Sequence, residues 1–133
     1  LIWGMHMCKL VQIKIDNKLI NVADLKERYI YNIVDAAKKC NYIDSIVLFG
    51  SSISERCKEE SDIDIAVFGN VPKSKCLTSK SFKDFAKNLY LFDDYEQNYD
   101  ILYFNSGQSA DIGILGEISK GEVIFKNVQA QDR

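Results

Sequence analysis

The feature that most constrains the fold is a pair of short apolar runs joined by a polar segment. The first, Ile43–Phe49, is rich in β-branched residues and ends directly at Gly50 and Ser51. The second, Ile63–Phe68, follows directly after Asp62. Runs of this length and composition, bounded by glycine and polar residues, are typical of buried strands. The sequence therefore predicts two core strands with polar side chains where the first ends and the second begins.

Hydrophobic periodicity predicts the other elements. Alternating apolar residues indicate strands, and apolar residues three or four positions apart indicate helices. We expect a hairpin over residues 10–22, helices over 24–40, 82–89 and 109–120, strands over 99–104 and 122–125, and an exposed loop from Lys73 to Lys80. This interleaving of helices and strands favours the α/β (α+β) class.

Length and composition indicate one folded domain. The 133 residues are 47% hydrophobic and 27% charged, as in ordinary globular proteins. We interpret residues 8–128 as the domain and residues 129–133 as a C-terminal tail. Residues 1–7 are interpreted as an N-terminal tail, and an upstream fusion is one source of such a tail. The net charge of −2 disfavours a long nucleic acid as partner, because no strong positive field attracts a phosphate backbone.

The cysteines and the apolar runs bear on the cellular setting. No Cys-x-x-Cys pair is present and His6 is the single histidine, which argues against a zinc site. Nothing in the sequence is typical of a secreted chain, so we expect reduced thiols and a cytoplasmic location. No apolar run approaches the roughly 18 residues that a membrane helix needs.

The candidate chemistry lies around the two core strands. Asp62 and Asp64 are two residues apart at the start of a strand, so their side chains point to the same face, roughly 7 Å apart. Neighbouring carboxylates repel each other unless a cation lies between them, and Mg²⁺ prefers such oxygen ligands together with phosphate oxygens. Gly50 would let backbone amides approach a phosphate, and Ser51 adds a hydroxyl donor.

A third acidic residue is expected on a neighbouring strand. Asp100 begins an apolar run and could complete a metal shell or accept a proton from the attacking hydroxyl. Asp93, Asp94 and Glu96 are the competing candidates. Metal ions, carboxylates and a phosphate-binding turn are the parts that phosphoryl and nucleotidyl transfer require.

These residues also carry a family resemblance. Gly50-Ser51, Asp62-Ile63-Asp64 and Asp100, each beside apolar strand residues, resemble the signature of the DNA polymerase beta nucleotidyltransferase superfamily. Within it, the chain is similar to minimal nucleotidyltransferases of the type that act as antitoxins of HEPN-domain toxins. The resemblance runs from about residue 25 to residue 125 and implies a small mixed β-sheet flanked by helices.

The resemblance also implies roles for individual residues. Asp62, Asp64 and Asp100 would be both the catalytic residues and the ligands of two Mg²⁺ ions. The residues expected to bind the nucleotide are Gly50, Ser51, Ser52, Arg56 and Ser61. Members of the family often carry a basic residue shortly after Gly-Ser, where this chain has Ser54, so Arg56 or Lys58 would have to substitute for it.

The expected function is therefore that of a Mg²⁺-dependent nucleotidyltransferase. It would transfer AMP from ATP, or another nucleoside monophosphate from its triphosphate, to a hydroxyl of a protein acceptor such as a HEPN toxin. A protein acceptor is favoured because the chain is almost all catalytic core. Two alternatives remain: an antitoxin-like binding protein with weak catalysis, and a transferase acting on a small molecule such as an aminoglycoside.

Overall fold

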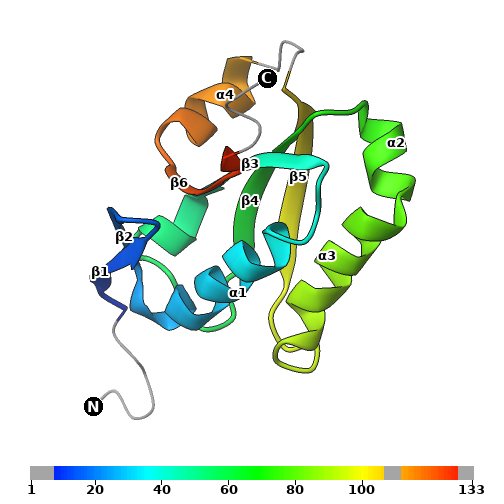
Figure 1. Ribbon diagram of the computed structural model, residues 1–133. Coiled ribbons are helices and arrows are strands. Elements are labelled where there is room, and N and C mark those ends of the chain that lie inside the picture. Colours follow the sequence, from blue (N-terminus) through cyan, green and yellow to red (C-terminus); the bar gives the residue numbers. More distant parts are fainter. Residues whose placement is uncertain (1–7, 107–111, 129–133) are drawn as a thin grey trace.

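A four-stranded sheet in the order β5-β4-β3-β6 forms the centre of the computed structural model, which describes residues 8–106 and 112–128 (Figure 1). Its strands are β3 (Ile43–Phe49), β4 (Ile63–Gly69), β5 (Tyr99–Asn105) and β6 (Glu122–Lys126). β4 runs parallel to β5 and antiparallel to β3, and β3 runs antiparallel to β6. The mixed sheet that the resemblance implied is confirmed.

A separate hairpin precedes the sheet. β1 (Leu10–Ile15) pairs with β2 (Lys18–Ala23) in antiparallel register, as the alternating pattern predicted. Asp16 and Asn17 form the two-residue turn with φ of 48° and 66°. Positive φ at both turn residues matches the right-handed twist of the strands, and aspartate and asparagine tolerate it well.

The helices flank the central sheet. They are α1 (Glu27–Ala37), α2 (Lys73–Thr78), α3 (Lys80–Leu91) and α4 (Ile112–Ser119), with short 3-10 turns η1 (Asp24–Lys26) and η2 (Gly50–Ile53). Figure 1 shows α1 and α3 on the same side of the sheet. Within the described ranges, no helix is both long and apolar enough to cross a membrane.

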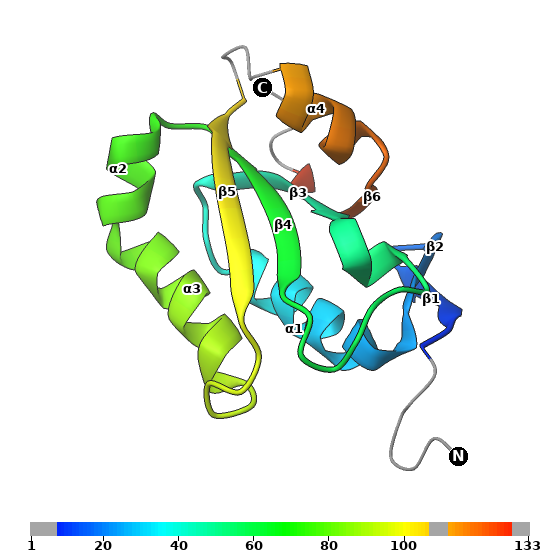
Figure 2. The ribbon, with the colours of Figure 1, turned by 180° about the vertical axis from the view of Figure 1, so that it is seen from behind.

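The two faces of the sheet are covered to different extents. Odd-numbered residues of β4, such as Ile63 and Ile65, belong to the main core with α1 and α3. Ala66 belongs instead to a small second cluster with Ile118 of α4. Because strand side chains alternate, Asp64 lies on the same face as Ala66. Figure 2 shows β4 and β5 from this side, with α4 near one end of the sheet.

The prediction of an exposed loop over Lys73–Lys80 is wrong. The segment forms α2 and the start of α3, which Ser79 separates. The amide of Cys76 donates to the carbonyl of Pro72 at 3.0 Å and closes the first turn, and the Cys76 side chain is fully buried. Cys76 is the single buried side chain of α2, so the sequence shows no apolar periodicity that would predict this helix. Burial of Cys76 stabilises the helix in the folded chain.

The other predicted helices form with shifted ends. Helix α1 begins three residues later than expected, because residues 24–26 form a 3-10 turn first. The hydroxyl of Ser79 accepts from the amide of Phe82 at 3.2 Å, which caps the start of α3. The last predicted helix is observed over Ile112–Ser119, and part of its expected range lies outside the described residues.

Candidate functional site

Strand pairing brings the three predicted acidic residues toward one end of the sheet. Asp64 of β4 is paired with Asp100 of β5 in parallel register, so both side chains lie on the face that α1 and α3 do not cover. Asp62 directly precedes β4, and Phe49, the last residue of β3, is paired with Asp64. The turn that begins at Gly50 therefore lies beside the acidic side chains.

Gly50 and Asp64 are packed directly against each other. Gly50 has φ of 74°, a left-handed conformation that residues with a side chain adopt at a cost. A Cβ atom at this position would also collide with the Oδ2 atom of Asp64. Both observations require glycine at position 50, because any side chain there would displace the carboxylate.

The electrostatics of the site favour a cation. Burial raises the pKa of Asp64, and the neighbouring carboxylates of Asp100 and Asp62 raise it further. Both Asp62 and Asp100 are exposed, whereas Asp64 is half-buried. A cation close to Asp64 would relieve this repulsion and hold the carboxyl in its ionised form.

The predicted acids do not form a closed metal cage. In the part of the chain that the structure describes, no group of three His, Cys, Asp or Glu side chains is arranged to hold a metal ion. Mg²⁺ is usually bound by one or two carboxylates that share it with waters and substrate phosphates. An open set of carboxylates around Asp64 fits that mode of binding, with Asp62, Asp64 and Asp100 as the residues that would hold the ion.

A buried hydroxyl in the turn that begins at Gly50 is a candidate phosphate donor. Ser52 is fully buried within η2, and its Oγ atom has no hydrogen-bond partner among the described residues. A buried unsatisfied hydroxyl costs about 1–3 kcal/mol, so native proteins usually satisfy it. A bound anion or water could do so here. Ser51, the preceding residue, is half-buried in the same turn.

The other two predicted nucleotide-binding residues lie on the loop between η2 and β4. Arg56 is exposed, and its backbone amide donates to the hydroxyl of Ser54 at 3.1 Å. The hydroxyl of Ser61 accepts from the amide of Lys58 at 2.9 Å and thereby shapes the loop before Asp62. Contact of either residue with a nucleotide stays a prediction.

Two buried polar residues that the sequence analysis did not single out support this loop. Lys26 is 1% exposed and Gln97 is 5% exposed. The Nζ atom of Lys26 donates to Oε1 of Gln97 at 2.7 Å and to the carbonyl of Glu59 at 2.9 Å. Burial lowers the pKa of Lys26, against the opposing effect of Cys57 and of nearby carboxylates that include Asp62.

Gln97 extends this network to the starts of both acid-bearing strands. Its Nε2 atom donates to the carbonyl of Ser61 at 2.9 Å and to that of Asn98 at 2.7 Å. The amide of Ile63 also donates to the carbonyl of Asn98 at 3.0 Å. We call Lys26 and Gln97 the clamp. In the sequence, Lys26 lies three, four and seven residues before Tyr29, Ile30 and Ile33, which are buried in α1. This helical spacing is a signal that would have predicted Lys26 on the apolar face.

Comparison with known proteins agrees with this geometry. Residues 31–130 match the family described as "Polymerase beta, Nucleotidyltransferase". No curated protein matches the chain in sequence.

Among solved structures, the chain resembles a toxin–antitoxin crystallised with AMP-PNP, at 20% identity and a TM-score of 0.50 over 80% of this chain and 77% of that one. It also resembles a mutant of the toxin–antitoxin MntA-HpeT at 18% identity, with the same TM-score and the same coverage of both chains. These likenesses support the fold. Since the family match covers most of the chain, the protein belongs to the Polymerase beta nucleotidyltransferase family.

Proposed function

We propose that the chain transfers AMP from ATP to a hydroxyl of a protein acceptor. The observation that carries the proposal is the packing of Gly50 against Asp64, with Asp100 paired beside it on the next strand. The turn that begins at Gly50 lies beside the half-buried carboxylate of Asp64 and its exposed neighbours Asp62 and Asp100. The turn can accept phosphates and the carboxylates a divalent cation.

Each residue has a definite role in this proposal. Asp62, Asp64 and Asp100 would hold Mg²⁺, which neutralises phosphate charge when it is bound. The backbone around Gly50 and the free hydroxyl of Ser52 would orient the triphosphate. The acceptor oxygen attacks the α-phosphorus, the bond from that phosphorus to the bridging oxygen breaks, and pyrophosphate leaves. Asp100, which is exposed, would take the proton of the acceptor hydroxyl.

The nature of the acceptor rests on the solved relatives. Two solved structures with a TM-score of 0.50 to this chain are toxin–antitoxin proteins, and one was crystallised with the ATP analogue AMP-PNP. We therefore propose ATP as donor and a toxin of the HEPN type as acceptor, in the cytoplasm.

Neutralisation of the partner by binding alone is the second candidate. It is favoured by the polar loop after Gly50-Ser51, where Ser54 is half-buried and Arg56 is exposed. A basic residue held beside the phosphates would strengthen triphosphate binding. Its absence at position 54 is compatible with a protein that binds its partner and transfers slowly.

Transfer of label separates the two candidates. Purified chain, Mg²⁺, ATP labelled on the α-phosphate and the toxin encoded beside it should yield a labelled toxin. We expect Asp62→Asn and Asp64→Asn to abolish labelling. The matched control is Asp35→Asn, because Asp35 is an exposed aspartate on α1.

The outcomes are distinct. Inhibition of the toxin that survives both substitutions without any labelling would support neutralisation by binding. If calorimetry detects no binding of ATP with Mg²⁺ to the unmodified chain, the transferase proposal is wrong.

A further inference from the structure

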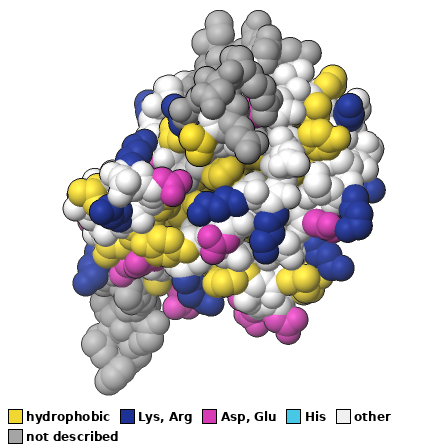
Figure 3. All heavy atoms as spheres, in the orientation of Figure 1, with side chains coloured by type: hydrophobic (Ala, Val, Ile, Leu, Met, Phe, Trp, Pro, Cys, Tyr) yellow, Lys and Arg dark blue, Asp and Glu magenta, His cyan; other side chains and the backbone are white. Residues whose placement is uncertain are grey.

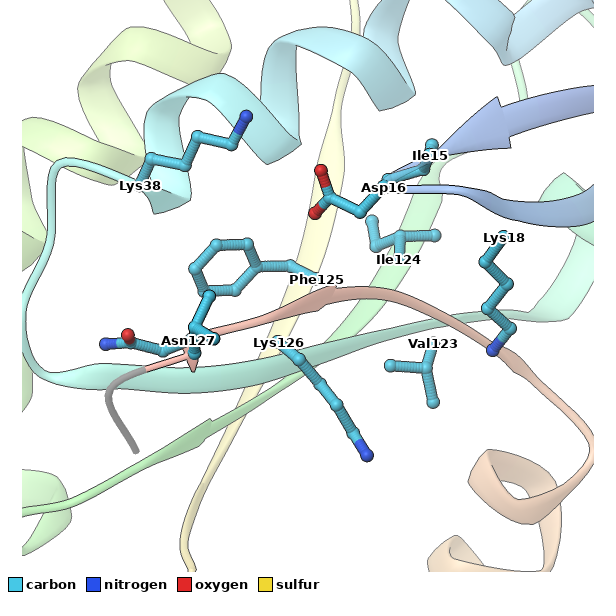
Figure 4. A pocket seen from close by; sticks show the side chains of 10 residues that line it. Ile15, Asp16, Lys18, Lys38, Val123, Ile124, Phe125, Lys126 and Asn127 are labelled. Carbon is cyan, nitrogen blue, oxygen red and sulfur yellow. The ribbon is translucent and has the colours of Figure 1, made fainter. Parts of the chain in front are cut away.

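A groove of about 600 Å³ lies at the edge of the sheet that is formed by β6 (Figure 4). One wall is the hairpin turn, with Asp16 and Lys18, together with Lys38 at the end of α1. The other wall is β6 and the two residues that follow it. Strands β4 and β3 separate this edge from β5, so the groove is at the opposite edge of the sheet from Asp100.

The strand that forms this wall is the last in the sheet order. β6 pairs with β3 on one side, and the groove follows its other side. An edge strand presents backbone N–H and C=O groups that another extended chain can pair with. Added strands of this kind gain affinity from main-chain hydrogen bonds and specificity from alternate side chains.

The groove has an apolar floor and an exposed apolar residue at its end. Ile15 and Phe125 line it and are mostly buried. Val128 also lines it and is 74% exposed, the most exposed of the large hydrophobic residues that the structure describes. A cavity of this size with apolar walls is suited to side chains of a ligand.

The polar residues of the groove are mainly basic. Three lysines, Lys18, Lys38 and Lys126, line it together with one acid, Asp16, although the whole chain carries a net charge of −2. Lysine on an edge strand can serve merely to prevent aggregation. That explanation covers Lys126 on β6 and Lys18 on β2, but not Lys38, which ends α1 on the opposite wall. Figure 3 shows lysine or arginine side chains beside hydrophobic ones near the middle of this face of the molecule.

We propose that this groove binds an extended, acidic segment of a partner protein, added as a strand along β6. Acidic side chains on one face of that segment would approach Lys126 and Lys18, and the alternate apolar side chains on its other face would rest on Phe125 and Ile15, on the side of Lys38 (Figure 4). The proposal concerns docking and does not depend on nucleotidyl transfer.

A defined peptide tests the proposal without ATP or Mg²⁺. The probe is a capped heptapeptide of alternating glutamate and valine, titrated into ¹⁵N-labelled protein at low salt. We expect amide shifts confined to β6, the hairpin turn and the end of α1. Lys18→Glu with Lys126→Glu should weaken binding about tenfold or more. Lys83→Glu, which changes an exposed lysine of α3, is the matched control.

Several results would overturn the proposal. They are shifts elsewhere in the protein, equal binding of a lysine–valine peptide, or undiminished binding by the double variant. Binding of glutarate as tight as that of the peptide would instead assign the groove to a small acid. Amide spectra of each variant before titration show that it is folded, and the single variant Lys126→Glu gives a milder second test. A failed label transfer alongside peptide binding would reject the proposed function and leave this docking site standing.

Discussion

Gly50 and Asp64 depend on each other at the level of single atoms. The left-handed backbone of Gly50 and the closeness of its Cα to the Asp64 carboxylate both follow from the sharp turn at the end of β3. The sequence indicated that Gly50 would let backbone amides approach a phosphate. The structure shows a second reason for glycine, which is the room that the carboxylate needs. That reason depends on the pairing of β3 with β4 and is absent from the local sequence.

Replacement of Gly50 by alanine should therefore damage both stability and activity. The positive φ and the contact with Asp64 together should lower the free energy of unfolding by about 1–3 kcal/mol. Label transfer should fall to background because the carboxylate is displaced. Urea denaturation and the transfer assay measure the two effects.

The control is Gly116→Ala in α4. A Cβ atom at Gly116 meets nothing within 4 Å, and alanine is the better helix former. This variant should be as stable as the original or up to about 1 kcal/mol more stable. Equal effects of the two substitutions would contradict the role assigned to Gly50.

Asp64→Asn should abolish Mg²⁺ binding while it increases stability. The pKa of Asp64 is raised by burial and by Asp100 and Asp62, so its ionised form is less favourable in the folded chain than in the unfolded chain. Removing the charge relieves this penalty at neutral pH. The penalty begins to shrink as pH falls through the raised pKa, and it is gone below the ordinary pKa of aspartate, where the carboxyl is protonated in both the folded and the unfolded chain.

Thermal unfolding without metal at several pH values checks this prediction. The variant should have the higher Tm at pH 7, and the difference should shrink as the pH is lowered toward the ordinary range of carboxyl groups. A variant that is less stable at pH 7 would show that other contacts of Asp64 outweigh the repulsion.

At the scale of elements, the clamp joins three separate segments of the chain. Lys26 comes from the turn before α1, Gln97 from the segment before β5, and both reach the loop before β4. Gln97 binds the carbonyls of Ser61 and Asn98; Asp62 directly follows Ser61, and Asp100 lies two residues after Asn98. The spacing of the acids thus depends on polar contacts between segments as well as on strand pairing.

Breaking the clamp should loosen the acids without unfolding the sheet. Lys26→Met leaves Oε1 of Gln97 and the carbonyl of Glu59 without their donor, at a cost of about 1–3 kcal/mol. Gln97→Leu should act similarly. Because the two residues share a hydrogen bond, the double variant should differ from the sum of the single variants by about 0.5–3 kcal/mol.

Denaturant unfolding measures the stability of the original chain, the two single variants and the double variant. Calorimetry measures their Mg²⁺ binding in the presence of ATP. Lys83→Met removes an exposed lysine from α3 and should change neither. Additive effects of the two single variants would show that Lys26 and Gln97 act independently.

In the whole molecule, one face of the central sheet is buried against α1 and α3, and the other face is partly exposed. The side against α1 and α3 holds most of the buried hydrophobic residues. On the other side, the described contacts of α4 cover Val47 and Ala66, while Asp62 and Asp100 are exposed. One face therefore supplies stability, and the other can carry charges that repel each other.

The reactivity of the four thiols tests which cysteine side chains are buried. Cys40, Cys57 and Cys76 are buried, and burial raises the pKa of Cys76 to about 11. Cys8 is half-buried. In the native protein at pH 8, we expect a thiol reagent to modify Cys8 first.

The three buried thiols should react slowly, at rates limited by opening of the structure. The measurement is mass spectrometry of the protein over time, with a sample in denaturant as the reference in which all four react. Rapid modification of Cys76 in the native protein would contradict its place in the core.

The sequence by itself determined the central strands and indicated the chemistry that we propose for the acids, because both depend on local patterns. Runs such as Ile63–Phe68 can bury their apolar side chains in few other ways, and the alternation of a strand puts Asp62 and Asp64 on one face. The family resemblance added Asp100 as the preferred third acid. The pairing of Asp100 with Asp64 of β4, however, depends on the parallel register of β4 and β5.

The tertiary structure decided whatever depends on partners far apart in the chain. It formed α2 around the buried Cys76, buried Lys26 against Gln97, and brought the hairpin turn beside β6 to make the lysine-lined groove. Each of these arrangements is stabilised by contacts between segments that local periodicity does not relate. Their physical basis is burial and hydrogen bonding across the fold, which exist once the sheet has assembled.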